Sequence, residues 1–164
     1  LSSQTAAHSA ALARESGVQI ALTLSDISMI EFCRSGLTAM LGDGVDTLFC
    51  NADEATEWAK TDRLDIAISE LKDIAKELYV TLGSDGAEVC TLEGRWQVGG
   101  ESIIPVDTNG AGDMFAGACL AARLQGAAAA DAARFANRAA ARVITQFGAR
   151  LPSLADYQQL SATK

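Results

Sequence analysis

Short apolar segments alternate with longer helical segments along the chain, and this alternation constrains the fold more than any other feature of the sequence. The runs at 18–24, 45–50 and 78–82 are short and apolar, which is typical of buried strands. The segments between them repeat apolar residues at three- and four-residue spacing, as amphipathic helices do. Because strand–helix–strand units form parallel strands joined by right-handed crossovers, we predict an α/β protein whose mainly parallel sheet is covered by helices on both faces.

The same pattern places the remaining elements. Helices are expected at 2–16, from a cap at Ser25 or Asp26 to 41, and at 51–60, 64–76, 111–124 and 129–147. Two short strands, 87–92 and 96–98, flank a local antiparallel hairpin turn. The last helix is amphipathic, because its charged residues share one stripe: Asp131, Arg134, Arg138 and Arg142.

Composition and charge limit the classes of function. The 49% hydrophobic and 21% charged residues indicate one folded domain, and the net charge of −8 at pH 7 disfavours nucleic acid and anionic membranes as partners. No apolar run reaches the roughly 18 residues of a membrane span, and the N-terminus lacks the charged and apolar regions of a signal peptide, so we expect a cytoplasmic protein. The cysteines lie far apart without a CxxC pair, and we expect them to be buried, reduced thiols: Cys33, Cys50, Cys90 and Cys119.

The sequence DTNGAGD at 107–113 stands directly before a helix rich in small residues. Backbone N–H groups at a helix N-terminus carry partial positive charge, and Gly or Ala there lets an anion approach the main chain. Asp113, in the first helical turn, adds a carboxylate that can accept a proton. In the alternative interpretation, Asp113 only complements the helix dipole and the glycines only form a tight turn. A turn needs one glycine, whereas Gly110, Ala111 and Gly112 are three small residues in a row, which favours a phosphoryl-transfer site.

Other nucleotide-binding classes fit the sequence less well. The chain has no GxxxxGK[ST] run, so it is not a P-loop NTPase. A dinucleotide-binding oxidoreductase would need GxGxxG between the first strand and helix, and DTNGAGD has a different spacing and lies late in the chain. Ligands of parallel sheets bind beyond the carboxyl ends of the strands, so the turns that begin at Asn51, Gly83 and Asp107 could converge on one rim.

The run DTNGAGDMFAG closely resembles the C-terminal signature of the ribokinase-like carbohydrate and nucleoside kinases, the PfkB family. NADE at 51–54 is similar to the family's NxxE, and TLGSDG at 81–86 to its nucleotide-binding strand and turn; Asn137 and FGA at 147–149 also agree in order and spacing. The resemblance implies a three-layer α/β/α ribokinase-like fold. In it, residues 1–164 would form the C-terminal, ATP-binding and catalytic portion of a single kinase domain, without the N-terminal acceptor-binding and lid portion.

The resemblance also implies roles for individual residues. Asp113 would be the base that deprotonates an acceptor hydroxyl, with Gly110, Ala111 and Gly112 as the anion hole for the γ-phosphate. Asn51 and Glu54 would organise Mg²⁺ and its waters, although NADE taken alone is more simply a helix start capped by Asn51. The nucleotide would contact Thr81, Gly83, Ser84, Gly86 and Asn137. TLGSDG by itself is an ordinary turn, and a solvated helix position is an equal alternative for Asn137. A monovalent cation such as K⁺ would lie near Asp107, Asn109 and Gly148.

The expected activity is ATP-dependent phosphorylation of a sugar or nucleoside hydroxyl, with ATP and Mg²⁺ as cofactors. DTNGAGD together with QFGARL at 146–151 is more similar to the adenosine kinase and broad sugar kinase branch than to ribokinase proper. An isolated half of such a fold would expose sheet edge and apolar surface, so we expect it to need its missing half, from a longer chain or a partner, or to self-associate. The open alternative is a nucleotide-binding chain without catalytic activity, either a fragment or a regulatory relative.

Overall fold

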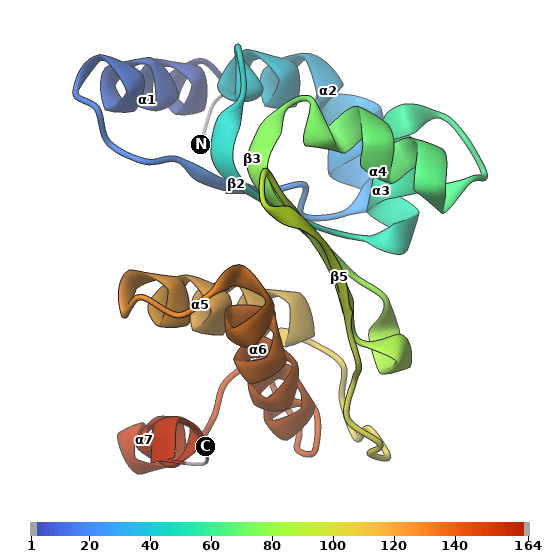
Figure 1. Ribbon diagram of the computed structural model, residues 1–164, viewed down its shortest axis with the longest axis vertical. Coiled ribbons are helices and arrows are strands. Elements are labelled where there is room, and N and C mark those ends of the chain that lie inside the picture. The colour runs from blue at the N-terminus through green and yellow to red at the C-terminus, as the bar shows by residue number, and fades with distance from the viewer. Residues whose placement is uncertain (1–2, 163–164) are drawn as a thin grey trace. The chain divides into compact units, whose positions relative to one another are not determined.

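The computed structural model describes residues 3–162, which contain a five-stranded sheet and helices before, between and after its strands (Figure 1). The strands follow one another in the sheet in chain order: β1 (Ala21–Thr23), β2 (Val45–Asn51), β3 (Ala75–Thr81), β4 (Ala87–Thr91) and β5 (Gly94–Val98). The pairs β1–β2 and β2–β3 are parallel. Neighbouring strands joined by only two residues, as β4 and β5 are, run antiparallel. The sheet is therefore mixed, and the predicted α/β class is confirmed.

Helices connect or follow these strands: α1 (Ser3–Glu15), α2 (Ile27–Leu41), α3 (Ala52–Ala59), α4 (Leu64–Lys72), α5 (Ala111–Leu124), α6 (Ala129–Val143) and α7 (Leu154–Ala162). The crossover β1–α2–β2 and the crossover β2–α3–α4–β3 both join adjacent parallel strands, as predicted. Helices α3 and α4 contact β3, α2 contacts α3, and α1 contacts α2.

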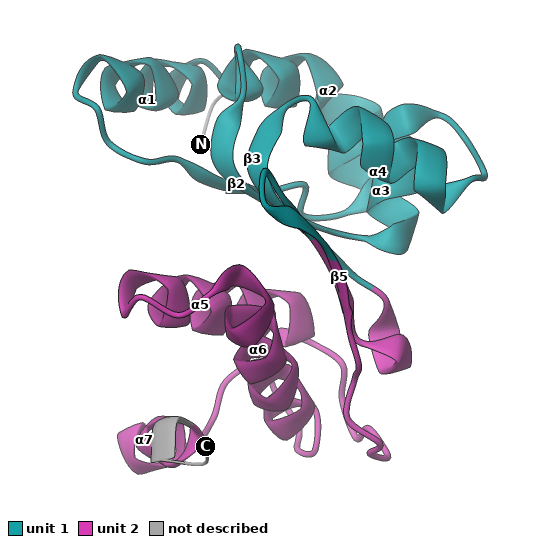
Figure 2. Cartoon of the chain, viewed as in Figure 1, with its two compact units in different colours: residues 1–81, 90–95 teal, residues 82–89, 96–164 magenta. Residues whose placement is uncertain are grey.

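The chain divides into two compact units, drawn in different colours in Figure 2. The first contains residues 1–81 and 90–95, and the second contains 82–89 and 96–164. The core of the first is formed by fully buried aliphatic side chains from the sheet and its helices, among them Leu48, Leu78 and Ile68. In the second, α5 packs on α6. The buried alanines of α6, including Ala132, Ala136 and Ala139, allow the two helices to approach closely.

The largest errors in the predicted boundaries are at β1, β3, α4 and α6. The strand expected at 78–82 begins earlier, at Ala75. The strand expected at 18–24 is limited to β1, because only Ala21–Thr23 pairs with β2. The helix expected at 64–76 ends at Lys72, because Ala75 already pairs with Val45 in the sheet. The helix expected at 129–147 ends at Val143. Its next carbonyl, that of Ile144, accepts hydrogen bonds from two N–H groups of a distant segment, at 2.8 and 3.3 Å.

The cysteine prediction holds for three of the four thiols. All four are free; Cys50, Cys90 and Cys119 are buried, whereas Cys33 is exposed. The backbone of Cys33 is non-helical, with φ −121° and ψ 18°, so α2 is kinked at this residue. A uniform helical period through α2 therefore does not predict which face carries Cys33.

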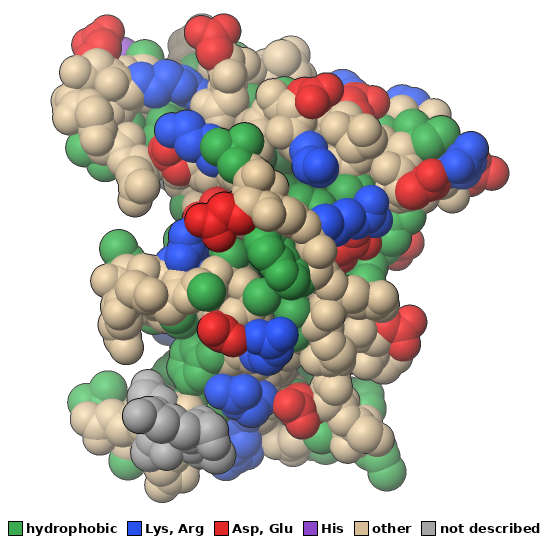
Figure 3. All heavy atoms as spheres, viewed as in Figure 1, with side chains coloured by type: hydrophobic (Ala, Val, Ile, Leu, Met, Phe, Trp, Pro, Cys, Tyr) green, Lys and Arg blue, Asp and Glu red, His purple; other side chains and the backbone are tan. Residues whose placement is uncertain are grey.

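The surface carries both signs of charge. On the face drawn in Figure 3, Lys and Arg side chains are interspersed with Asp and Glu. Among residues 3–162, no helix is both long enough and apolar enough to cross a membrane.

Candidate active site

The N-terminus of α5 has no side-chain cap. Gly110 is the N-cap residue, with a positive φ of 76°, and the helix begins at Ala111. The first turn of a helix leaves N–H groups without an intrahelical acceptor, and they concentrate positive potential. No side chain occupies these donors at α5, and the N–H of Ala111 donates to the carbonyl of Thr108 at 3.2 Å. The remaining first-turn N–H groups suit a bound anion such as a phosphoryl group.

The turn before α5 is fastened to the turn after α6. The carboxylate of Asp107 accepts two backbone hydrogen bonds, from the N–H of Asn109 at 3.0 Å and from the N–H of Gly148 at 2.9 Å. Both bonds lower the pKa of Asp107 below its ordinary value, and the bond from Asn109 has the larger effect. Asp107 is therefore an anion at neutral pH. The structure thus brings together Asp107, Asn109 and Gly148, the three residues expected around a monovalent cation.

Gly110 lies in direct contact with the same turn. A Cβ at this position would lie 2.6 Å from the carbonyl oxygen of Ala149 and 2.6 Å from its Cβ. The positive φ is also a conformation that favours glycine. Both constraints explain why glycine stands at 110, whereas a Cβ at Gly112 would meet no atom within 4 Å. The shape of the anion-binding turn therefore depends on residues 148–149.

Asp113 is exposed in the first turn of α5 and lines a cavity of about 890 Å³ within the second unit. The cavity continues along α5 and is also bordered by Arg150, Tyr157 and Leu160. An exposed carboxylate in the same first turn as uncapped helix N–H groups can take a proton from a hydroxyl held beside a bound phosphoryl group.

Asn51 and Glu54 form a capping box at the start of α3. The Asn51 Oδ1 accepts from the N–H of Glu54 at 2.8 Å, and the Glu54 Oε2 accepts from the N–H of Asn51 at 3.1 Å. The Asn51 Nδ2 also donates to the Glu54 Oε1 at 2.7 Å. The NADE motif is thus a helix cap, as its simpler interpretation predicts, and this cap also holds the Glu54 carboxylate in one orientation.

Glu54 is a buried carboxylate, with 6% of its surface exposed. Burial raises its pKa, the hydrogen bond from the Asn51 backbone lowers it, and the charges of Asp26 and Asp53 raise it further. Asp26 is the cap of α2, as its place before that helix predicts, and it also lies close enough to Glu54 to affect its pKa. Its position after a parallel strand, like that of Asn51, is the signal that could have placed it near Glu54.

The strand ends bring two of the predicted nucleotide-binding segments side by side. Asn51 and Thr81 are register partners at the carboxyl ends of β2 and β3. A single 3₁₀ turn follows, Gly83–Asp85, and the N–H of Leu82 donates to the carbonyl of Gly86 at 2.8 Å. A Cβ at Gly86 would lie 2.0 Å from the carbonyl oxygen of Val98, so this turn packs tightly on the segment after β5.

Asn137 is buried, with 8% of its surface exposed, so its alternative interpretation as a solvated helix residue is wrong. Its Nδ2 donates to the carbonyl of Gly99 at 3.0 Å and, more weakly, to that of Val98 at 3.4 Å. Gly100, the next residue, lies against Ser84, since a Cβ there would be 2.3 Å from the Ser84 carbonyl oxygen. Asn137 and the predicted nucleotide turn thus meet through residues 98–100.

The predicted residues therefore form separate groups within the two units. Asn51, Glu54 and Thr81 lie together in the first unit. The turn at 83–86 and Asn137 form one group in the second unit, and residues 107–113 with 148–149 form another. Among residues 3–162, no three His, Cys, Asp or Glu side chains gather closely enough to hold a metal ion. If this part of the chain binds Mg²⁺, the one carboxylate that we assign to it is that of Glu54.

Fold and site together define a class: an α/β protein with an uncapped, glycine-preceded helix N-terminus beside an exposed carboxylate. The chain belongs to the pfkB family of carbohydrate kinases, whose sequence pattern matches residues 1–156. The family resemblance predicted from DTNGAGD and its accompanying motifs is confirmed.

Individual relatives and solved structures agree with this assignment. "Probable fructokinase-5" of Arabidopsis thaliana is 35% identical over 130 residues, which cover 73% of this chain and 40% of that protein. The adenosine kinase of Sinorhizobium meliloti superposes with a TM-score of 0.87 at 30% identity, covering 97% of this chain and 49% of the other. A "probable sugar kinase" of Rhizobium etli CFN 42 gives 0.86 and 30%, covering 96% and 48%. The chain thus spans about half the length of these solved structures.

Proposed function

We propose that this chain is the nucleotide-binding and catalytic portion of an ATP-dependent kinase that phosphorylates a hydroxyl of a sugar or nucleoside. One observation carries the proposal: in a pfkB family chain, the uncapped N-terminus of α5 carries the exposed Asp113 in its first turn. Phosphoryl transfer needs positioned donors for the charge on the transferred group and a base for the attacking hydroxyl. The turn at 110–113 provides both kinds of group.

In this proposal Asp113 takes the proton of the acceptor hydroxyl, and the backbone N–H groups at Gly110, Ala111 and Gly112 stabilise the negative charge on the transferred phosphoryl group. The first-turn N–H groups, which no side chain caps, support the second role, because they are already oriented before the reaction. The N–H of Ala111 also donates to the carbonyl of Thr108 at 3.2 Å, so it would be shared between that carbonyl and the anion. The exposure of Asp113 supports the first, because the carboxylate is accessible to a hydroxyl.

ATP with Mg²⁺ fits the donor chemistry of the chain. Carboxylate oxygen is a ligand type that Mg²⁺ prefers, and Mg²⁺ usually keeps several waters when a protein binds it. The proposal assigns Glu54 to those waters and Asn51 to the orientation of Glu54, which the capping box supports. When bound, Mg²⁺ would neutralise charge on the phosphates.

The remaining assignments follow the same reasoning. Contacts to the nucleotide are assigned to Thr81, Gly83, Ser84, Gly86 and Asn137, and K⁺ to the neighbourhood of Asp107, Asn109 and Gly148. Gly83 supports a main chain that a nucleotide can approach, since a Cβ there would meet no atom within 4 Å, whereas Gly86 packs against residues 98–100. The anionic Asp107 supports a cation site, although both its oxygens already accept hydrogen bonds.

The acceptor is assigned to the sugar and nucleoside class because the relatives named above are a fructokinase, a sugar kinase and an adenosine kinase. We propose that both units belong to one kinase domain, and that the residues that grip the acceptor come from the portion of that domain which this chain does not span. A non-catalytic, nucleotide-binding relative is the second candidate, and only turnover separates the two.

The decisive experiment is ATP turnover by the complete native polypeptide over a panel of sugars and nucleosides, with phosphorylated product measured directly. We expect saturable, Mg²⁺-dependent phosphorylation of one acceptor class. In parallel, calorimetry of the 164-residue chain with ATP, with and without Mg²⁺, tests whether this portion binds nucleotide by itself. Failure of the complete polypeptide to bind ATP would rule out the kinase proposal, whereas ATP binding without turnover of any acceptor would favour the non-catalytic candidate.

The substitution Glu54→Gln separates the structural role of Glu54 from its proposed role toward Mg²⁺. Glutamine keeps the capping-box bond from the Asn51 N–H through its one oxygen, so the helix start is retained, but its Nε2 cannot accept the bond from the Asn51 Nδ2. Burial raises the pKa of Glu54, which means that the charged form is disfavoured in the folded state and that stability is lost as pH rises through this pKa. Loss of the bond from the Asn51 Nδ2 opposes the gain from removing a buried charge, so the melting temperature of Glu54→Gln at pH 7 should stay close to that of the wild type. Its apparent Mg²⁺ affinity, measured from activity at fixed ATP, should fall about 10- to 100-fold.

Asp53→Asn is the matched control, since Asp53 is an exposed carboxylate in the same helical turn. It removes one charge near the site without touching the capping box, and its Mg²⁺ dependence should resemble that of the wild type. Equal Mg²⁺ dependence in Glu54→Gln and the wild type would contradict the magnesium assignment.

A further inference from the structure

The turn that follows α6 supports the anion-binding turn from behind. Ala149 contacts Gly110 so closely that a Cβ on Gly110 would lie 2.6 Å from its carbonyl oxygen. The N–H of Gly148 donates to Asp107 at 2.9 Å, and the N–H of Val106 donates to Ile144 at 2.8 Å. Any displacement of residues 147–150 is therefore transmitted to residues 106–110 and to the start of α5.

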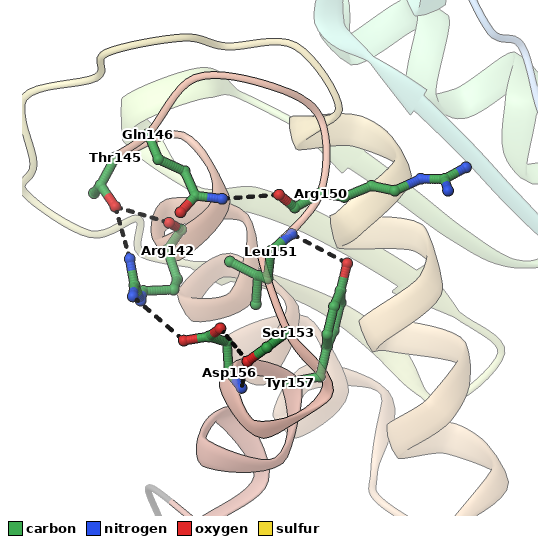
Figure 4. Close-up of polar contacts among 8 residues, drawn as sticks. All are labelled: Arg142, Thr145, Gln146, Arg150, Leu151, Ser153, Asp156 and Tyr157. Atoms are coloured by element: carbon green, nitrogen blue, oxygen red, sulfur yellow. Dashed lines mark hydrogen bonds and ion pairs between the residues drawn. The ribbon is translucent and has the colours of Figure 1, made fainter.

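This supporting turn is itself held at both ends by side chains (Figure 4). On the α6 side, the Nε2 of Gln146 donates to the carbonyl of Arg150 at 2.8 Å. On the α7 side, the hydroxyl of Tyr157 accepts the N–H of Leu151 at 3.2 Å. Leu151 is also buried, with 5% of its surface exposed, which anchors this end in the core.

Helix α7 is in turn fixed to α6. The Oγ of Ser153 donates to Asp156 at 2.6 Å and accepts the N–H of Asp156 at 3.3 Å, which caps the start of the helix. The other carboxylate oxygen of Asp156 lies 4.0 Å from the guanidinium of Arg142, at the end of α6. Figure 4 shows these contacts on one side of the turn, with the side chain of Arg150 extending away from them. Tyr157 consequently projects from a helix whose start is fastened, toward the turn that backs Gly110.

We propose that Tyr157 is a positioning residue that holds residues 147–151 against the anion-binding turn at 107–112. This inference rests on the proposed function, because it assigns to Tyr157 an effect on phosphoryl transfer exerted through Gly110. In the proposal Tyr157 acts through the position of this turn and not by contact with the reacting groups. Its hydroxyl accepts the N–H of Leu151, and that bond sets the position of Ala149 two residues earlier in the chain.

Tyr157→Phe tests the proposal, because it removes the hydroxyl and keeps the ring that borders the cavity. Amide hydrogen exchange is measured in two peptides, one covering 147–151 and the other 106–112. We expect faster exchange in both. In the turnover assay we expect kcat to fall about 3- to 10-fold, the range of one net hydrogen bond, with unchanged KM for ATP and for the acceptor.

Tyr79→Phe is the matched control, since Tyr79 and Tyr157 are the two tyrosines of the chain. The hydroxyl of Tyr79 donates to Glu77 at 2.9 Å, on β3 in the first unit. Its loss should lower the melting temperature to a similar degree without changing kcat or the exchange of residues 106–112. If loss of stability alone lowered activity, Tyr157→Phe and Tyr79→Phe would both lose activity.

The two measurements keep the proposals distinguishable. Faster exchange in both peptides together with a lower kcat supports the positioning role. Unchanged exchange at 106–112 overturns it, and so does a kcat equal to that of the wild type despite faster exchange. If the wild-type polypeptide shows no turnover, the proposed function fails, and the exchange of residues 106–112 still decides whether Tyr157 supports that turn.

Discussion

Asp113→Asn should lower kcat about 100- to 10,000-fold on the best acceptor, the range that a positioned general base contributes. Asparagine has nearly the same shape but cannot accept the proton of the hydroxyl. Asp113 is exposed, and its side chain makes no hydrogen bond or ion pair among residues 3–162. Its loss should therefore leave the core intact. The KM for ATP should change little, because the helix N–H groups that face the phosphate remain.

The measurement is steady-state turnover of the purified complete polypeptide, with the melting temperature recorded for both proteins. Removing a negative charge from the first turn of a helix costs about 0.3–1 kcal/mol, so only a small decrease in melting temperature is expected. A kcat close to that of the wild type would show that Asp113 is not the base. The carboxylate would then be left with its simpler role of complementing the dipole of α5.

Gly110→Ala should also have a large effect, on both activity and stability. The new Cβ would meet the carbonyl oxygen of Ala149 at 2.6 Å, and the positive φ of 76° is strained for alanine. Overpacking of this kind costs about 1–3 kcal/mol, and the turn must shift to relieve it. Because the shift moves the N–H groups at the start of α5, we expect kcat to fall about 100- to 1,000-fold, as when one oxyanion donor is lost.

Gly126→Ala controls for the backbone strain in this experiment. Gly126 also has a positive φ, of 88°, but a Cβ there would meet no atom within 4 Å. It follows the end of α5, away from the anion-binding turn. The control should lose stability through strain while keeping its kcat. If the two variants lose activity equally, the contact between Gly110 and Ala149 has no specific role in the reaction.

The family and the general fold were predictable from the sequence, because they depend on local patterns. Apolar runs and helical periodicity predicted the strands and helices, and DTNGAGD with NADE and TLGSDG predicted the pfkB family, which the comparisons confirm. The errors lie where contacts distant in sequence end an element. Pairing of Ala75 with Val45 begins β3 early, and the bonds from Val106 and Asp107 to Ile144 accompany the end of α6. The helix α7 was not predicted at all.

By itself, then, the sequence determined the α/β class, the order of the elements, the family, and the residue types of the candidate site. These follow from periodicity and from short motifs, whose physical basis is local along the chain. Only the tertiary structure decided how the turn at 107–113 is supported. The contact of Gly110 with Ala149, the bonds of Asp107 to Asn109 and Gly148, and the bond from Leu151 to Tyr157 give the turn its shape. Two of these contacts, Gly110 with Ala149 and Asp107 with Gly148, join segments about 40 residues apart, and no sequence period relates them. The shape of the turn at 107–113 therefore depends on residues 147–151, of which the FGA motif covers 147–149, and on α7, which no motif identified.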